Sequence, residues 1–166
     1  MAYVTFKGSE IKLTGCVPAV GDVAPAFTLA GTDLADVALS DFKGKRVVIS
    51  VFPSIDTPVC AASVRHFNLD ASTMKNAVVL CISADLPFAQ ARFCGAEGLK
   101  NVKTLSTFRS PGFGAAYGLQ IAAGPLRGLL SRAVMIVDEQ GLIAYVEVVS
   151  EVTNEPNYAA ALNLLK

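Results

Sequence analysis

A chain of 166 residues fits one domain, and we expect residues 1–166 to form it, since 52% of them are apolar and can fill a substantial core. Fourteen basic residues balance fourteen acidic ones, so no overall charge attracts nucleic acid or an anionic membrane. No apolar run reaches the length of a membrane span, and the first residues lack the basic-then-apolar order of a signal peptide. A cytoplasmic location is therefore expected.

The first elements predicted along the chain are short strands. Residues 3–6 and 10–14, separated by Lys7-Gly8-Ser9, predict a β-hairpin, and residues 26–29 predict another strand. All three come before the long apolar runs, so they are expected to precede the main part of the domain.

The middle of the chain predicts a βαβ crossover. Residues 46–52 and 77–83 are continuous apolar, β-branched runs of the kind that form strands buried on both faces, and a helical segment separates them. A second helix is expected to begin near Pro87 and to end at Gly95 as its C-terminal cap. Residues 103–106 predict a further strand.

The last third of the chain predicts a hairpin and a closing helix. The hairpin pairs residues 133–137 with residues 142–149, and the helix covers residues 158–165. The glycines of residues 110–118 lack the pattern of a phosphate loop and are interpreted as turns, with Phe108, Phe113 and Tyr117 as core residues. Together the elements predict one α/β domain with a mixed sheet and helices on both faces.

Cys60 occupies the most informative position in the sequence. It follows the strand and loop of residues 46–57, and with Thr57 as N-cap and Pro58 at the first helical position it becomes the third residue of a helix. The unpaired N–H groups and positive end of the helix dipole favour the thiolate there, and the thiolate is the nucleophile. A free cysteine is often only a small core residue. The Thr-Pro helix start favours a chemical role.

The other three cysteines have different settings. Cys94 lies near a helix end that can fray, so oxidation can bring it to Cys60; the alternative is a buried helix-end cysteine. Cys81 lies inside an apolar strand and is interpreted as core, whereas Cys16 carries no readable role. Thiols stay reduced in the cytosol, so any bridge is expected to be transient. With no C-x-x-C pair and one histidine, a metal site is not expected.

Three residues are candidates to activate Cys60. His66 lies six residues along the same helix, about 120° around it, which weakens but does not end the hypothesis of a cysteine hydrolase. Arg132 precedes the strand of residues 133–137 and can hold a thiolate and polarise a bound oxygen, although an arginine there is more often a solvated strand end. The Thr57 hydroxyl can cap the helix, turn toward the thiolate, or do both.

The pattern Pro53-x-x-x-Thr57-x-x-Cys60 resembles the peroxidatic motif of the peroxiredoxins. The sequences of residues 57–65 and 84–94 are similar to those of the bacterial thiol peroxidase subfamily, the atypical two-cysteine peroxiredoxins. The similarity extends along the chain from Thr5-Phe6-Lys7-Gly8 to Glu155-Pro156.

The resemblance implies a thioredoxin-like fold with an N-terminal β-hairpin. It implies that Cys60 is the peroxidatic cysteine and Cys94 the resolving cysteine, that Thr57 and Arg132 complete the site, and that Pro53 shapes the loop and shields the sulfur. It further implies reduction of hydrogen peroxide and organic hydroperoxides, thioredoxin as electron donor, and homodimers. No metal or organic cofactor is implied.

A binding protein is the competing hypothesis. A redox sensor or holdase would use the same disulfide to switch a partner surface and would need the thiols without turnover. Nucleic acid and membrane are not expected partners in either case.

Overall fold

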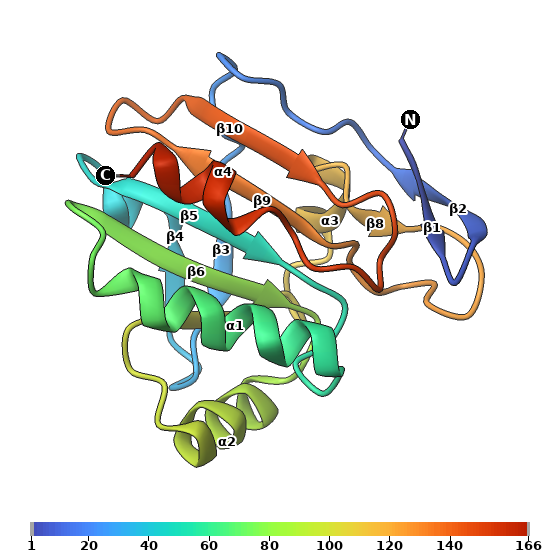
Figure 1. The fold of residues 1–166 in the computed structure, drawn as a ribbon, viewed down its shortest axis with the longest axis horizontal. Helices are drawn as coiled ribbons and strands as arrows, with labels where there is room; N and C mark the ends of the chain where they lie inside the picture. The colour runs from blue at the N-terminus through green and yellow to red at the C-terminus, as the bar shows by residue number, and fades with distance from the viewer. Residues whose placement is uncertain (1, 166) are drawn as a thin grey trace.

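The computed structural model describes residues 2–165, and a mixed seven-stranded sheet lies at its centre (Figure 1). The strand order is β10-β9-β5-β6-β7-β3-β4. The bounds of these strands are β3 Thr28–Ala30, β4 Asp36–Ala38, β5 Arg46–Val51, β6 Ala77–Ser83, β7 Lys103–Ser106, β9 Ala133–Val137 and β10 Ile143–Val148. This arrangement confirms the predicted α/β class, with β4 as a strand that the sequence did not reveal.

The centre of the sheet is built as its residue types require. β5, β6 and β7 run parallel, and β5 and β6 consist mainly of buried apolar residues, because both faces of the sheet are covered. The helix α1 (Pro58–Ala71) connects β5 to β6 as the predicted crossover. Val51 pairs with Ile82, so the loops that follow these two strands leave the sheet at the same edge.

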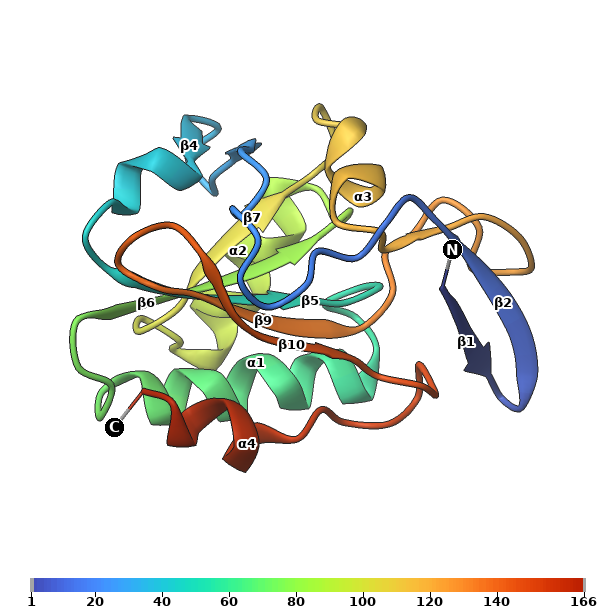
Figure 2. The same ribbon diagram turned by 90° about the horizontal axis from the view of Figure 1, so that it is seen from above.

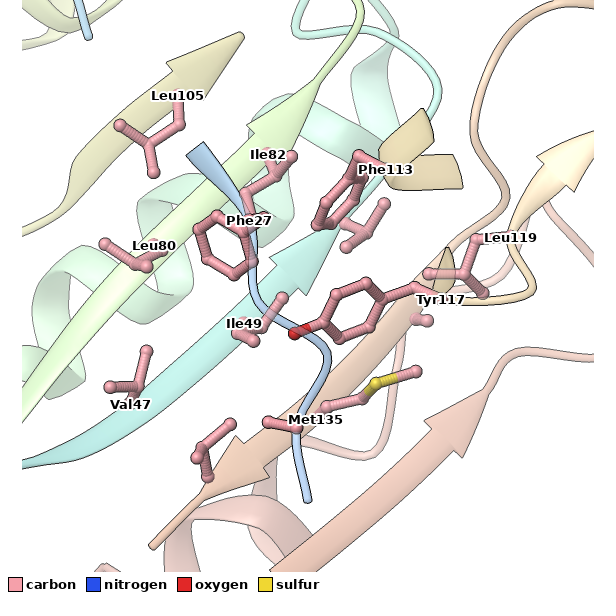
Figure 3. Packing of buried hydrophobic residues seen from close by; sticks show 14 of the residues in the cluster. Phe27, Val47, Ile49, Leu80, Ile82, Leu105, Phe113, Tyr117, Leu119 and Met135 are labelled. Carbon is pink, nitrogen blue, oxygen red and sulfur yellow. The ribbon is translucent and has the colours of Figure 1, made fainter. Parts of the chain in front are cut away.

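Helices cover the two faces of the sheet unequally. Figure 2 shows α1 and α4 (Tyr158–Asn163) below the sheet, with α3 (Gly112–Ala116) and part of the segment between β2 and β3 above it. The upper core packs Phe27, Phe113 and Tyr117 against the sheet (Figure 3). The lower core contains Cys60 and Phe67 of α1, with side chains from α2 (Pro87–Glu97) and α4 packed around them.

The predicted N-terminal hairpin is confirmed. β1 (Tyr3–Phe6) and β2 (Ser9–Thr14) pair in antiparallel fashion, and β2 pairs in turn with the short strand β8 (Gln120–Ile121). Backbone hydrogen bonds join Thr5 to Ser150 and to Val152, so this small sheet is attached to the segment that follows β10.

The second helix ends later than predicted. Gly95 does not cap α2, which continues to Glu97 and is capped by Gly98 with a left-handed φ of 67°. The Leu99 N–H donates to the carbonyl of Cys94, which closes the helix end. Cys94 therefore lies in the last turn of the helix rather than at its final residue.

Two further predictions for residues 108–118 were wrong. Gly112 and Gly114 lie inside α3 rather than in turns, and a Cβ on Gly114 would come within 2.4 Å of the Gln120 side chain, so close packing is the reason for this glycine. Phe113 and Tyr117 are core residues as predicted, but Phe108 is 46% exposed. Within residues 2–165, no helix has the length and apolar character needed to cross a membrane.

Candidate active site

Cys60 lies in the first turn of α1, where the sequence placed it. Thr57 is the N-cap, and its Oγ1 accepts a hydrogen bond of 3.2 Å from the Cys60 N–H. Pro58 occupies the first helical position, where its missing N–H costs nothing. The Thr57 hydroxyl keeps its own proton to donate, so capping leaves it able to serve a second oxygen. The Cys60 side chain is fully buried among apolar residues.

Arg132 brings a charge to this buried sulfur. Its Nη2 donates to Cys60 Sγ at 3.1 Å, and its Nε donates to the carbonyl of Val152 at 3.0 Å. The residue is only 2% exposed, so the interpretation of a solvated strand end is wrong. The ion pairs among residues 2–165 do not include Arg132. A buried cation is costly unless it is hydrogen-bonded, and the Cys60 sulfur and the Val152 carbonyl are the partners that Arg132 has here.

The guanidinium also retains hydrogen-bonding capacity. Among the described residues, Nη1 of Arg132 is buried and has no partner. A planar guanidinium presents its five donors in a fixed fork, so one side chain can hold the sulfur and an adjacent oxygen together. Pro53 is buried in the loop between β5 and α1, in the segment that sets the approach to Cys60.

Cys94 is held in different surroundings on α2. It is half-buried and lines a pocket of about 480 Å³ together with Leu99, Lys103 and Thr104. Burial raises the pKa of the Cys94 thiol, and a hydrogen bond from Thr104 opposes that increase. Both Cys60 and Cys94 are free thiols in this structure.

Comparison with known proteins shows the family of this chain. Residues 19–162 match the Redoxin family. The chain belongs to the Redoxin family. A thiol peroxidase of Mycobacterium bovis is 52% identical over 165 residues, which are 99% of each chain.

Two solved structures share the whole architecture. A peroxiredoxin-like protein from Aquifex aeolicus superposes with a TM-score of 0.94 at 39% identity, covering 99% of this chain and 96% of the other. A thiol peroxidase from Chromobacterium violaceum gives a TM-score of 0.91 at 26% identity, covering 98% and 94%. The resemblance to thiol peroxidases and the predicted thioredoxin-like fold are thereby confirmed.

Among residues 2–165, no hydrogen bond or ion pair joins the other reactive side chains of this Redoxin-family chain to Cys60. The His66 Nε2 lies 2.9 Å from an Asp70 carboxylate oxygen, and the ring stacks on Tyr158 with centroids 3.7 Å apart. Its position agrees with the helix geometry that argued against a cysteine–histidine pair. Cys81 is fully buried in β6, as predicted, and burial strongly raises the pKa of its thiol. Cys16 is exposed.

An ion pair joins α1, which carries Cys60, to α2, which carries Cys94. Arg65 of α1 donates through Nε and Nη2 to the two carboxylate oxygens of Glu97 at 3.0 and 2.8 Å. This pairing lowers the pKa of Glu97 and raises that of Arg65. Because Glu97 is the last residue of α2, the contact holds the helix end next to Cys94 against α1.

Sequence reasoning missed Asp85 as a feature of the site. Its carboxylate accepts hydrogen bonds from Ser54 and Ile55 of the loop that leads to Cys60. The available signal was positional: β5 and β6 were predicted as neighbouring parallel strands, and the residues after such strands meet at one edge of the sheet.

Proposed function

We propose that this chain is a thiol-dependent peroxidase that reduces hydrogen peroxide and organic hydroperoxides. The observation that carries the proposal is the buried Cys60 sulfur, which lies at a helix N-terminus and 3.1 Å from an arginine that has no carboxylate partner among residues 2–165. Family membership and the relationship to thiol peroxidases support the same reaction.

The first step transfers one oxygen atom to Cys60. The thiolate attacks the nearer peroxide oxygen, the O–O bond breaks, and the electron pair leaves with the second oxygen. Arg132 and Thr57 donate hydrogen bonds to the charge that develops, and a proton from solvent completes water or an alcohol. Cys60 becomes a sulfenic acid. Pro53 shapes the loop and shields the sulfur from solvent.

The second step joins the two cysteines. The Cys94 sulfur attacks the Cys60 sulfenic acid, an S–S bond forms, and water leaves. A disulfide requires Cα atoms about 4.4–6.8 Å apart, so the helix start at Cys60 and the helix end at Cys94 must loosen. Thioredoxin then supplies two thiols, which exchange with the bridge and restore Cys60 and Cys94.

The proposal extends to the setting in which the enzyme works. Residues 1–166 form one peroxiredoxin domain, the protein assembles as a homodimer, and it works in the cytoplasm, where thioredoxin is present. Exposed apolar side chains near the start of α2, Leu86 and Phe88, provide surface for a second copy. Sedimentation equilibrium of the reduced protein tests the dimer.

Continuous turnover is the decisive experiment for the function. With thioredoxin, its reductase and NADPH, the protein should consume hydrogen peroxide over many equivalents per chain. A redox sensor or holdase that used the same disulfide would stop after one equivalent. Consumption that ends at one equivalent with a functional reductase system would therefore favour the sensor.

Peptide mapping tests the assignment of the resolving cysteine. After one equivalent of peroxide, non-reducing digestion should yield one bridged pair of peptides that contain Cys60 and Cys94. A bridge from Cys60 to Cys81 or Cys16, or a bridge only between chains, would overturn the role of Cys94.

A further inference from the structure

The carboxylate of Asp85 gathers three hydrogen bonds beside the loop that carries Cys60 into place. The Ile55 N–H donates to Oδ2 at 2.7 Å, and the Ser54 hydroxyl donates to Oδ1 at 2.8 Å. The hydroxyl of Ser83, at the end of β6, donates to Oδ2 at 2.6 Å. Hydrogen bonds to a carboxylate are shorter and stronger than those between neutral groups, so these contacts fix the loop firmly.

The backbone of Asp85 is anchored from the opposite side. The hydroxyl of Ser106, the last residue of β7, donates to the Asp85 carbonyl at 2.5 Å. Gln90 of α2, whose side chain is fully buried, donates to Ser83 Oγ at 3.1 Å and to the Leu105 carbonyl at 2.9 Å. Asp85 is therefore a fixed point, joined to the ends of β6 and β7 and, through Ser83, to α2.

The loop held by this fixed point ends at the peroxidatic turn. Ile55 is 1% exposed, and the Thr57 N–H donates to the Ser54 carbonyl at 3.1 Å, so the position of Ser54 and Ile55 determines where Thr57 starts the helix. Without the Asp85 acceptor, the Ile55 N–H would lose its hydrogen-bond partner in a partly buried place. The next helix, α2, starts two residues after Asp85 and carries Cys94.

We propose that Asp85 is a positioning residue that holds the Cys60 loop in a closed form, the form that reacts with peroxide. Release of the loop from Asp85 permits the disulfide to form. The proposal rests on the peroxidase function argued above. In the closed form Cys60 is buried against Arg132, and Cys94 is a separate free thiol on α2. Asp85 thus sets the balance between oxidation of Cys60 and its capture by Cys94.

The variant Asp85→Asn tests this balance because it keeps the shape of the side chain. An amide replaces one carboxylate oxygen with an NH₂ group, which donates and cannot accept, so at least one of the three donors loses its partner. Losing one hydrogen bond to a charged group is expected to raise the open fraction of the loop about tenfold. The rate of disulfide formation from the sulfenic acid should rise by that factor.

The first step should respond in the opposite direction. In the Cys94→Ser background, which isolates the reaction of Cys60 with peroxide, Asp85→Asn should slow oxidation because Thr57 and Cys60 spend less time in the closed form. The whole enzyme should also resist overoxidation, with about tenfold more peroxide needed to convert half of Cys60 to sulfinic acid. Since the chain contains no tryptophan, acid-quenched samples and intact mass spectrometry are suited to follow both steps.

Two further variants separate positioning from stability. Ser54→Ala removes the partner of Oδ1 together with the acceptor of the Asp56 N–H, leaves the Asp85 carboxylate in place, and should shift both steps in the same directions by less, even if Asp85→Asn folds poorly. Asp56→Asn makes the same chemical change one residue beyond Ile55, at a side chain that is 63% exposed and 3.5 Å from Arg92, and should leave both rates unchanged.

The outcomes are distinct. Faster disulfide formation with slower or equal oxidation supports the role of Asp85. Unchanged or slower disulfide formation in both Asp85→Asn and Ser54→Ala overturns it, since a merely structural role lowers both rates together. Failure of the peroxidase proposal would be visible separately, because Cys60 of the unaltered protein would then not be oxidised by peroxide.

Discussion

Cys60 and Cys94 carry the same thiol in opposite surroundings. Cys60 is fully buried in the first turn of a 14-residue helix, with an arginine on its sulfur and a capping threonine beside it. Cys94 is half-buried in the last turn of an 11-residue helix, its pKa is raised by burial, and a neutral hydroxyl is its polar neighbour.

In the mechanism that we propose, this difference divides the reaction between two identical side chains. The cysteine that meets peroxide must be a thiolate before the substrate arrives, so its helix start and its cation are built into the resting fold. The cysteine that resolves the sulfenic acid needs to react only after the structure opens. Burial raises the pKa of its thiol, so the folded helix end does not favour the thiolate.

Removing each sulfur in turn gives the largest expected effect. Cys60→Ser should abolish peroxide reduction, because a serine hydroxyl does not supply an anion near neutral pH. Cys94→Ser should react once with peroxide and stop at the sulfenic acid, which a dimedone adduct on Cys60 would reveal by mass spectrometry. A folded Cys94→Ser protein that does not react at all would place Cys94 in the first step.

Changing Arg132 should produce the next largest effect, which should be confined to the reactions of Cys60. Arg132→Met leaves a buried anion without its cation, a loss of about 3–4 kcal/mol, so oxidation of Cys60 should slow roughly 100- to 1,000-fold. Alkylation of Cys60 with iodoacetamide at neutral pH should slow as well, because less thiolate is present.

Arg132→Lys is the matched control for that experiment. It keeps the charge and loses the planar fork, so alkylation of Cys60 should persist while the peroxide rate falls. If the methionine variant alkylates and oxidises at the unaltered rates, Arg132 has no part in activating Cys60, and the helix start with Thr57 provides the activation.

Thr57 should have a smaller effect, again restricted to Cys60. Thr57→Val removes the acceptor of the Cys60 N–H and the donor for the peroxide oxygen at nearly constant volume. Loss of a cap costs about 1 kcal/mol, so single-turnover oxidation should fall roughly five- to tenfold. Thr57→Ser keeps the hydroxyl and should recover most of the rate; equal rates for the serine and valine variants would contradict the role of the hydroxyl.

Thr104 provides the corresponding test on the Cys94 side. Its hydroxyl lowers the pKa of the Cys94 thiol against the effect of burial, so Thr104→Val should raise that pKa further. Alkylation of Cys94 across a range of pH should show this as a curve displaced to higher pH, while oxidation of Cys60 by peroxide should be unchanged. Equal alkylation curves for the two proteins would contradict the effect of Thr104 on the Cys94 thiol.

The two sites were not equally readable from the sequence. The Cys60 turn was predicted residue by residue, because Thr57 and Pro58 are local signals that fix a helix start within one turn. The end of α2 was predicted three residues early, since Gly95 and Gly98 are both suitable caps. The Arg65–Glu97 contact that supports the last turn joins two different helices, so local sequence does not reveal it.

Long-range contacts account for the rest of what the sequence did not reveal. The burial of Arg132 depends on Val152 and Cys60, which lie 20 and 72 residues away along the chain. The loop contacts of Asp85 span about 30 residues. The resemblance to peroxiredoxins implied the role of Arg132 before any such contact was known, whereas residue pattern alone favoured a solvated side chain.

The smallest expected effect on catalysis concerns Glu151, on the Cys60 side of the molecule. Hydrogen bonds lower the pKa of Glu151 to about 2, although burial opposes them. The largest contribution comes from Thr5, followed by the N–H of Lys7, Thr153 and the N–H of Gly8. Because the folded pKa lies below the ordinary value of 4.5, the carboxylate stabilises the fold above pH 4.5, and that contribution disappears as the pH falls toward 2.

Glu151→Gln should therefore unfold at lower urea concentration than the unaltered protein at pH 7 but lose less further stability between pH 4.5 and pH 2. Glu151 precedes Val152, whose carbonyl holds Arg132, and its bonds attach the N-terminal hairpin to this segment. Any change in rate should consequently appear in oxidation of Cys60 and not in disulfide formation by Cys94. If the two proteins lose the same stability at acid pH in urea titrations, another carboxylate governs this pH range. If Glu151→Gln changes only the rate of disulfide formation, the hairpin acts on the α2 side instead.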